Sequence, residues 1–221
     1  ICCNDWNMVS CDASGWKTLS QTKPKLVRSS GMLPLPSPSQ SGDFELLWEF
    51  LNVQKDTDRK LITVWLLTAL MPNISYPLIV FTGEQGTAKS TATRLLRSII
   101  DPHDSPLRTL PTKEKDLYIS AHNNWVLAFD NMSGLTPTMS DALCKIATGG
   151  SFTGRTLYSN DEETVLKACN PLILNGITDF VTRQDLVDRA YVIQLERITK
   201  RKSEKKLWAE FEKAHPILLG G

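Results

Sequence analysis

The segment that most constrains the fold lies near the middle of the chain, where residues 76–96 read YPLIVFTGEQGTAKSTATRLL. An apolar run at 78–81 leads into a turn with two glycines, and Lys89 and Ser90 then open an amphipathic helix. Glycines let the backbone wrap an anion, and the amides of the turn and of the helix N-terminus point toward anionic oxygens. This order predicts a strand, a phosphate-binding loop and a helix, in preference to an ordinary turn beside a solvated lysine.

The residues of this loop have separate expected roles in binding a nucleoside triphosphate. We expect Lys89 to reach the β- and γ-phosphates and Ser90 to hold Mg²⁺. The general pattern has glycine immediately before the lysine, and we interpret Ala88 as a small residue that suffices in the first turn of the helix. The expected ATP-binding set is Gly83, Glu84, Gln85, Gly86, Thr87, Ala88, Lys89, Ser90 and Thr91.

Two later apolar runs end in polar residues that suit the same site. The run at 125–130 ends in Asp130, as expected for a strand buried on both faces whose carboxylate emerges beside the phosphate loop. We expect Asp130 to hold the Mg²⁺ ion, directly or through water. Asn131 follows, and an amide can orient the attacking water but cannot take its proton. The run at 171–175 ends in Asn175, which is placed to hydrogen-bond the γ-phosphate or that water.

Composition limits the remaining classes of function. The chain has 221 residues, 41% of them hydrophobic, and 25 basic against 24 acidic side chains. It can therefore bury a core, and no global field draws it to nucleic acid or a membrane, so any DNA contact must be local. The apolar run at 61–71 is about half of a bilayer-spanning helix and is interpreted as a core helix. Five scattered cysteines favour reduced thiols in an intracellular compartment, with Cys2, Cys3 and Cys11 as an alternative metal set.

Patterning divides the chain into four expected parts. Residues 1–42 hold short antiparallel strands with a turn at Ser14 and Gly15, then a Pro/Ser/Gly-rich linker from 32. Residues 43–74 form a helical subdomain, residues 75–197 the ATPase core, and residues 198–221 a C-terminal helix that starts a lid. A start at Ile1 without methionine indicates a piece of a longer protein. The other expected elements are helices from Asp43 and at 58–70, 113–120, 136–147, 184–187 and 203–214, and strands at 107–110, 152–158, 164–168 and 191–195.

Several segments in this order resemble the motifs of AAA+ helicases. They are residues 83–90, 125–131, 145–158, 171–175 and 185–189. The closest likeness is to superfamily 3, the motors of viral, plasmid and prophage replication proteins, which are often fused behind a primase. Ala88, Lys89 and Ser90 also look like the phosphate loop of minichromosome-maintenance helicases. The resemblance covers roughly 76–195 and implies an α/β fold, an AAA+ P-loop NTPase with a central parallel sheet flanked by helices, preceded by a small helical subdomain and short N-terminal β-strands.

The resemblance implies a role for individual residues. Ser90 and Asp130 fall on the metal-binding positions, and Asn175 falls on the polar sensor. Arg189 falls where a neighbouring subunit supplies an arginine finger, with Arg183 as a reserve, and the alternative for Arg189 is a local salt bridge to an aspartate at 185 or 188. The expected catalytic set is Lys89, Asp130, Asn131, Asn175 and Arg189.

DNA contact is expected from a hairpin. Gly149 and Gly150 fall on the motif peculiar to superfamily 3, whose hairpin lines a central DNA channel. The turn of the hairpin is acidic here, at 161–163, so Arg155 and Lys167 on its two arms are the expected contacts with phosphates. The alternative is a solvated hairpin that binds no ligand.

The leading hypothesis is a replicative helicase motor with ATP and Mg²⁺ as cofactors. It would assemble as a homo-oligomeric ring, a hexamer, and pull single-stranded DNA in the bacterial or host cytoplasm, with a fused or partner primase and no membrane association. The element encoding it would be mobile or viral. The alternatives are an AAA+ switch or loader without processive unwinding, and a degenerate nucleotide-binding module, which Asn131 suggests.

Overall fold

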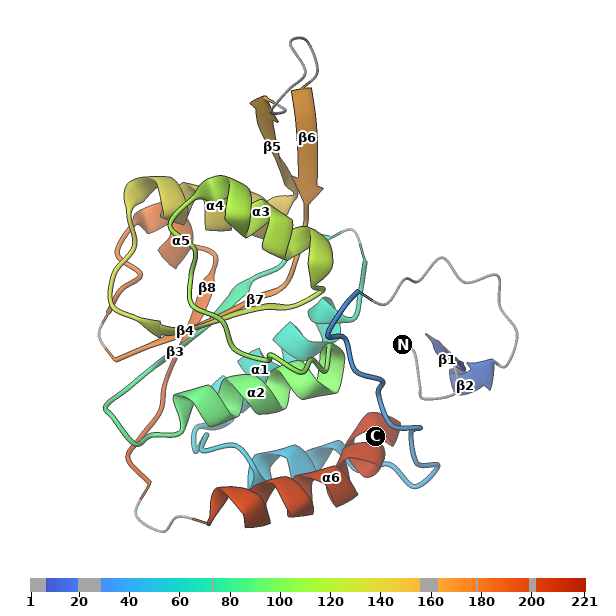
Figure 1. The fold of residues 1–221 in the computed structure, drawn as a ribbon. Helices are drawn as coiled ribbons and strands as arrows, with labels where there is room; N and C mark the ends of the chain where they lie inside the picture. Colours follow the sequence, from blue (N-terminus) through green and yellow to red (C-terminus); the bar gives the residue numbers. More distant parts are fainter. Residues whose placement is uncertain (1–6, 20–28, 73, 156–162, 178, 199–201) are drawn as a thin grey trace.

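The computed structural model describes residues 7–19, 29–72, 74–155, 163–177, 179–198 and 202–221. Its centre is a four-stranded sheet in the order β4-β7-β3-β8, in which every neighbouring pair is parallel (Figure 1). Its strands are β3 (Leu78–Thr82), β4 (Leu127–Met132), β7 (Leu172–Gly176) and β8 (Ala190–Gln194). The two central strands are apolar along most of their length and fully buried, as expected where helices cover both faces. All four carboxyl ends therefore lie along one side of the sheet, which we call the carboxyl edge.

Helices pack on both faces of this sheet. Ile79 and Phe81 of β3 pack in a core with α1 (Asp56–Ala69) and α2 (Lys89–Ile100). Leu78 and Val80 pack in a second core with α3 (Glu114–Asn123), α4 (Pro137–Thr148) and α5 (Gln184–Val187). Successive side chains of a strand point to opposite faces, so one continuous apolar strand serves both cores. The predicted α/β class, with a central parallel sheet flanked by helices, is confirmed.

The apolar run at 61–71 lies largely in α1. Ile62, Trp65 and Leu66 are buried in the first core, which confirms the interpretation as a core helix. Val64 and Leu67 lie on the outer side of the helix and are about half exposed. In the described part of the chain, no helix combines the length and apolarity that crossing a bilayer requires.

The predicted strand at 107–110 is reduced to one parallel bridge beyond β4, between Arg108 and Phe129. The Arg108 amide donates to the Ala128 carbonyl (3.0 Å), and its carbonyl accepts from the Asp130 amide (2.9 Å). Prolines at 106 and 111 flank this stretch and cannot donate to a ladder. The pairing therefore stops after one residue, although it continues the sheet past β4.

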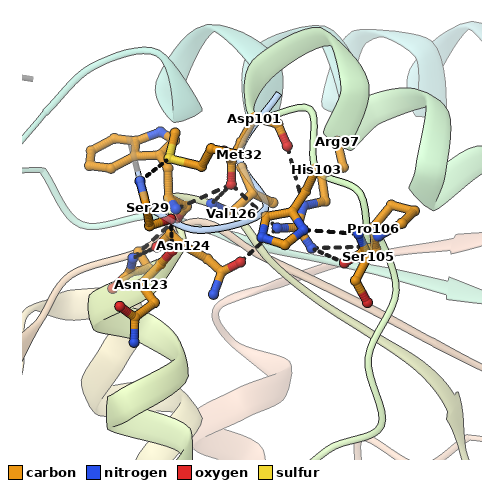
Figure 2. Close-up of polar contacts among 12 residues, drawn as sticks. Ser29, Met32, Arg97, Asp101, His103, Ser105, Pro106, Asn123, Asn124 and Val126 are labelled. Atoms are coloured by element: carbon orange, nitrogen blue, oxygen red, sulfur yellow. Dashed lines mark hydrogen bonds and ion pairs between the residues drawn. The ribbon is translucent and has the colours of Figure 1, made fainter. Parts of the chain in front are cut away.

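A buried polar cluster joins the end of α2 to the start of β4 (Figure 2). Arg97 and Asp101 are both 1% exposed, and their charged groups lie 3.5 Å apart. Arg97 donates to Asn124 Oδ1 (2.9 Å), while Asp101 Oδ2 accepts from the amides of Trp125 (3.2 Å) and Val126 (3.0 Å). Burial lowers the pKa of the Arg97 guanidinium, an effect that the Asp101 carboxylate opposes. The cluster closes the irregular stretch between these two elements.

The N-terminal segments largely follow the prediction. β1 (Met8–Asp12) and β2 (Gly15–Leu19) form the expected antiparallel hairpin, with its turn at residues 13 and 14, one residue before the predicted position. Asp43 caps the next helix, as predicted, by accepting from the Glu45 amide (2.9 Å). That helix, η1 (Phe44–Glu49), is nevertheless a 3₁₀-helix and ends sooner than the apolar pattern indicated. A short 3₁₀ connector of this kind is common where a chain enters a domain.

The C-terminal helix α6 (Glu204–Gly220) is longer than the predicted 203–214 and continues past Pro216. The carbonyls of Pro216 and Ile217 accept from the amides of Ser39 (2.8 Å) and Asp43 (3.1 Å) in the linker. These two bonds tie the last turn of the helix to the residues just before η1. The helix therefore has a partner for its last turn that the local sequence does not reveal.

Candidate nucleotide-binding site

The phosphate-binding loop lies at the carboxyl edge, between the end of β3 and the start of α2. Gly83 has φ +142°, and a Cβ there would lie 2.5 Å from the Leu195 carbonyl oxygen. Gly86 also has a positive φ, +89°. Both positions therefore favour glycine. At Gly83 there is also no room for a side chain, because the residue that follows β8 lies against it. The strand, loop and helix lie where the sequence predicted them.

Ala88 is the last residue of the loop and adopts a left-handed conformation, with φ 66° and ψ 32°. It is the N-cap of α2 rather than a member of its first turn, which corrects our interpretation of this position. A left-handed conformation disfavours any residue with a Cβ by roughly 1–2 kcal/mol, whereas glycine adopts it freely. The general preference for glycine before the lysine thus has a backbone cause here, and a small side chain does not remove it.

Lys89 folds back over the loop. Its Nζ donates to the carbonyls of Gly83 and Glu84, both at 2.8 Å, and lies 3.4 Å from Thr87 Oγ1. Burial lowers the pKa of Lys89, and the charge of Asp130 acts in the opposite direction. The Asp130 carboxylate is therefore within electrostatic range of the ammonium. A bound phosphate would offer Lys89 oxygens in place of these two carbonyls.

Asp130 and Asn131 lie at the end of β4, where the register with β7 shifts between Phe129 and Met132. Asn131 has φ +57°. Its amide donates to Asp130 Oδ1 (2.7 Å) and to Asn175 Oδ1 (3.1 Å). Asparagine adopts the left-handed conformation more readily than other residues with a Cβ, which gives a backbone reason for an amide at this position.

Asn175 is completely buried in β7, the strand between β3 and β4. Its Nδ2 donates to Thr93 Oγ1 (3.0 Å), and the Thr93 hydroxyl donates to the Lys89 carbonyl (3.1 Å). The sequence analysis missed Thr93. Its only signal was a hydroxyl on the largely apolar buried side of a helix, four residues after the lysine. Contact between Asn175 and a phosphate stays a prediction.

The predicted metal ligands offer the oxygen atoms that Mg²⁺ prefers. Within the described residues, the Ser90 hydroxyl has no side-chain or loop partner, so its oxygen is available. The same described ranges contain no cluster of three or more His, Cys, Asp or Glu residues that could hold a metal. One hydroxyl and one carboxylate fit Mg²⁺, which takes most of its remaining ligands from water and phosphate. Of the alternative metal set, Cys11 is a free, exposed thiol, and residues 2 and 3 lie outside the described chain.

A hollow of about 630 Å³ opens beside the loop. Its lining comes from the ends of β3 and β8, from the start of α1 and from residues that follow β7, and it includes neither Asp130 nor Asn175. Its volume is within the range of small-molecule sites. The lining residues are Lys55, Asp58, Thr82, Gly83, Glu84, Ile177, Asp179, Val192 and Gln194. Gly83 and Glu84, whose carbonyls accept from Lys89, thus also line the hollow.

Arg189 lies at the opposite edge of the sheet from the loop. Its carbonyl accepts from the amide of Leu78, the first residue of β3, and the loop follows the last residue of that strand. A strand of this length separates the two by roughly 13 Å along its axis. The side chain is 42% exposed, donates to the Asp185 carbonyl (2.7 Å) and lies 4.0 Å from the Asp185 carboxylate. The reserve residue, Arg183, pairs with Asp141 at 2.9 Å.

The predicted hairpin is formed by β5 (Gly150–Arg155) and β6 (Glu163–Ala168), which project beyond α3 and α4 (Figure 1). Gly149 ends α4 with φ +89°, and a Cβ at Gly150 would lie 2.8 Å from Lys145 Cβ. The glycine pair therefore permits the tight turn from helix to hairpin. Lys167 is exposed, opposite Ser151. The Arg155 side chain and residues 159–162 of the predicted turn at 159–163 lie outside the described residues, and residue 163 begins β6.

Comparison with known proteins agrees with this architecture. A family model described as actinomycete integrative conjugative element replication protein matches residues 44–221. No curated protein sequence matches the chain.

Two solved structures of the C-terminal region of NrS-1, both without ligand, superpose with a TM-score of 0.56. They are 17% and 16% identical and each covers 96% of this chain, which spans 52% and 51% of theirs. A JCV helicase with a bound acetamide compound is 14% identical with a TM-score of 0.48, over 80% of this chain and 51% of that one. The chain therefore spans about half the length of these structures. The likeness to NrS-1 concerns the fold alone and agrees with the predicted α/β class.

Proposed function

This chain belongs to the actinomycete integrative conjugative element replication protein family, and from that premise we propose that it is the ATP-dependent helicase motor of a mobile element. ATP would bind at the loop ahead of Lys89, with Mg²⁺ held by Ser90 and Asp130. Hydrolysis would move the chain along single-stranded DNA. Replication of the element would place this work in the bacterial cytoplasm. A primase partner stays an expectation from the resemblance.

One observation carries the proposal: a loop shaped for an anion and a carboxylate meet at the carboxyl edge. Lys89 begins α2 just after the loop that follows β3, and Asp130 lies near the end of β4, so the topology brings both to this edge. Open α/β sheets bind ligands at this edge. The triphosphate would point its γ-end toward Asp130, and the nucleoside would then extend toward β8 and the hollow there. When bound, Mg²⁺ would neutralise charge on the phosphate oxygens.

The chain's own groups would supply position and charge. Lys89 would balance the phosphate charge, and the glycines would let the loop amides approach it. Asn131 would orient a water but take no proton, so catalysis would rest on charge stabilisation.

Arg189 supports a ring in which each site is completed by the next subunit. It lies at the far edge of the sheet from its own loop, so it can reach a phosphate only on a neighbouring copy. Its ion pair with Asp185 is half exposed and therefore weak, which leaves the guanidinium able to exchange partners. A hexamer is the ring size that the resemblance implies. The projecting hairpin of β5 and β6, with Lys167 on its exposed side, would then face the DNA.

The test is ATP turnover with and without single-stranded DNA. The motor proposal expects strong stimulation by DNA, and Lys89→Ala should abolish nucleotide binding or turnover. Arg189→Ala should keep ATP binding and lose turnover, and a mixture of the two variants should recover activity, because each would supply what the other lacks. Lys167→Ala should weaken DNA stimulation without changing basal turnover.

The opposing results are equally definite. Turnover that ignores DNA would favour a switch or loader, and binding without turnover would favour a degenerate module. Full activity in Lys89→Ala would refute the nucleotide assignment itself.

A further inference from the structure

A continuous row of hydrogen bonds joins the phosphate loop to the end of β4. It starts at the Lys89 carbonyl, which accepts from the Thr93 hydroxyl (3.1 Å). Thr93 Oγ1 accepts from Asn175 Nδ2 (3.0 Å), and Asn175 Oδ1 accepts from the Asn131 amide (3.1 Å). The same amide donates to Asp130 Oδ1 (2.7 Å). The row thus begins at the lysine and ends at the carboxylate expected to bind the metal.

Thr93 determines which way the row points. Its hydroxyl has one hydrogen, and that hydrogen is directed to the Lys89 carbonyl. The oxygen can therefore only accept from the neighbouring carboxamide, so it must face the NH₂ group of Asn175 rather than the oxygen. This turns Asn175 Oδ1 toward Asn131. The side chains of Thr93 and Asn175 have no exposed surface, so bulk water does not compete for either contact.

The far end of the row is held in an uncommon backbone conformation. Asn131 has φ +57°, and its amide is shared between Asp130 Oδ1 and Asn175 Oδ1. Without an oriented acceptor on Asn175, the amide would keep only the carboxylate of its own neighbour. Because the two oxygens share one amide hydrogen, losing the Asn175 acceptor changes the bond to Asp130, so the direction of the Asp130 carboxylate depends on the orientation that Thr93 imposes on Asn175.

We propose that Thr93 is a positioning residue that couples occupancy of the phosphate loop to the orientation of Asp130. The inference rests on the proposed function, because it takes Asp130 as the metal-binding acid. Movement of Lys89 upon phosphate binding would shift its carbonyl, and the row would carry that shift to Asn131 and Asp130. Thr93 touches neither nucleotide nor metal in this account.

The test compares three variants. Thr93→Val keeps the shape but removes the hydroxyl, and Thr93→Ser keeps the hydroxyl. Thr63→Val is the matched control, because Thr63 makes the same bond to the carbonyl four residues earlier (Oγ1 to Arg59 O, 2.9 Å) in α1, away from the loop. The readout is the affinity for a fluorescent non-hydrolysable ATP analogue in EDTA and in Mg²⁺, and the ratio of the two. Turnover gives kcat and KM separately.

We expect Thr93→Val to bind the analogue normally in EDTA and to lose most of the tightening by Mg²⁺. Its kcat should fall about tenfold or more while KM changes less than about twofold, because a misplaced group affects the reacting geometry before it affects binding. Thr93→Ser should restore both, and Thr63→Val should match the wild type. In an Asn175→Ala background, Thr93→Val should cause no further loss, because both act on one row.

A wild-type Mg²⁺ ratio and kcat in Thr93→Val, failure of serine to rescue, or a multiplicative double variant would each overturn the proposal. Thermal unfolding of each variant excludes loss of fold, and Thr93→Ala replaces Thr93→Val if valine prevents folding. A wild type that binds nucleotide with Mg²⁺ but does not turn it over would refute the motor, while the Mg²⁺ ratio would still decide the role of Thr93. A wild type that binds no nucleotide would refute both.

Discussion

Ala88 combines a side chain and a backbone conformation that disfavour each other. It ends the phosphate loop with φ 66° and ψ 32°, and its side chain makes no capping bond to α2. Ala88→Gly removes the Cβ and leaves the loop's other contacts in place. We expect the variant to be more stable than the wild type, which is unusual for a substitution that adds glycine next to a helix.

The magnitude follows from two opposing terms. Relief of the left-handed conformation is worth roughly 1–2 kcal/mol. Glycine has greater conformational freedom in the unfolded chain, which lowers the free energy of unfolding by roughly 0.4–1 kcal/mol. The net gain lies between about 0 and 1.6 kcal/mol, and for a chain of 221 residues the central value of about 0.8 kcal/mol raises Tm by about 2–3 °C.

The assay is thermal unfolding followed by circular dichroism, with no nucleotide present. Ala209→Gly is the matched control, because Ala209 is exposed in the interior of α6 and has ordinary helical geometry. That change should lower stability by about 0.8–1 kcal/mol. A fall in Tm for Ala88→Gly similar to that of the control would show that residue 88 is not left-handed in solution and would refute the reasoning.

Two further predictions concern buried charge. Asp101→Ala should lower the free energy of unfolding in urea by about 3 kcal/mol or more, because it leaves the Arg97 guanidinium buried without its carboxylate. Asp56→Ala removes one partner of an exposed ion pair and should leave the urea midpoint of unfolding unchanged. Equal effects of the two substitutions would contradict this prediction. Burial lowers the pKa of His215 to about 4, so below its ordinary value of 6.5 the unfolded chain binds a proton that the native chain excludes. The contribution of His215 to the free energy of unfolding should therefore be fully present above about pH 6.5 and should fall by up to about 1.4 kcal/mol per pH unit toward pH 4. When unfolding is measured across this pH range, His215→Gln should reduce the slope. The control His122→Gln, at an exposed histidine, should leave the slope unchanged.

The elements that the sequence predicted well are those whose pattern is local. The apolar strands at 78–81 and 171–175, and the helix of 184–187, appear within one residue of their expected bounds. The C-terminal helix was predicted too short because its last turn is completed by amides of the distant linker. The predicted strand at 107–110 forms only one bridge, because the flanking prolines limit pairing. These prolines are visible in the sequence and already disfavour a longer strand.

The same distinction between local pattern and distant contacts applies to the candidate site. Its chain order and residue types were readable, and the structure brings Lys89, Asp130 and Asn175 to one edge of the sheet. Backbone angles were not readable, so the left-handed residues Ala88 and Asn131 were misjudged or left without explanation. Thr93 was missed because its importance depends on a partner 82 positions away in the sequence. The expected finger at Arg189 concerns a second chain, which one sequence cannot place.

The bonds from Ser39 and Asp43 to the last turn of α6 bear on how this protein should be shortened. The family match begins at residue 44, immediately after those two amides. A truncation designed on that boundary would leave the Pro216 and Ile217 carbonyls open to solvent and would loosen the helix that packs on η1. The smallest stable piece of this chain therefore starts before residue 44, where the family match begins.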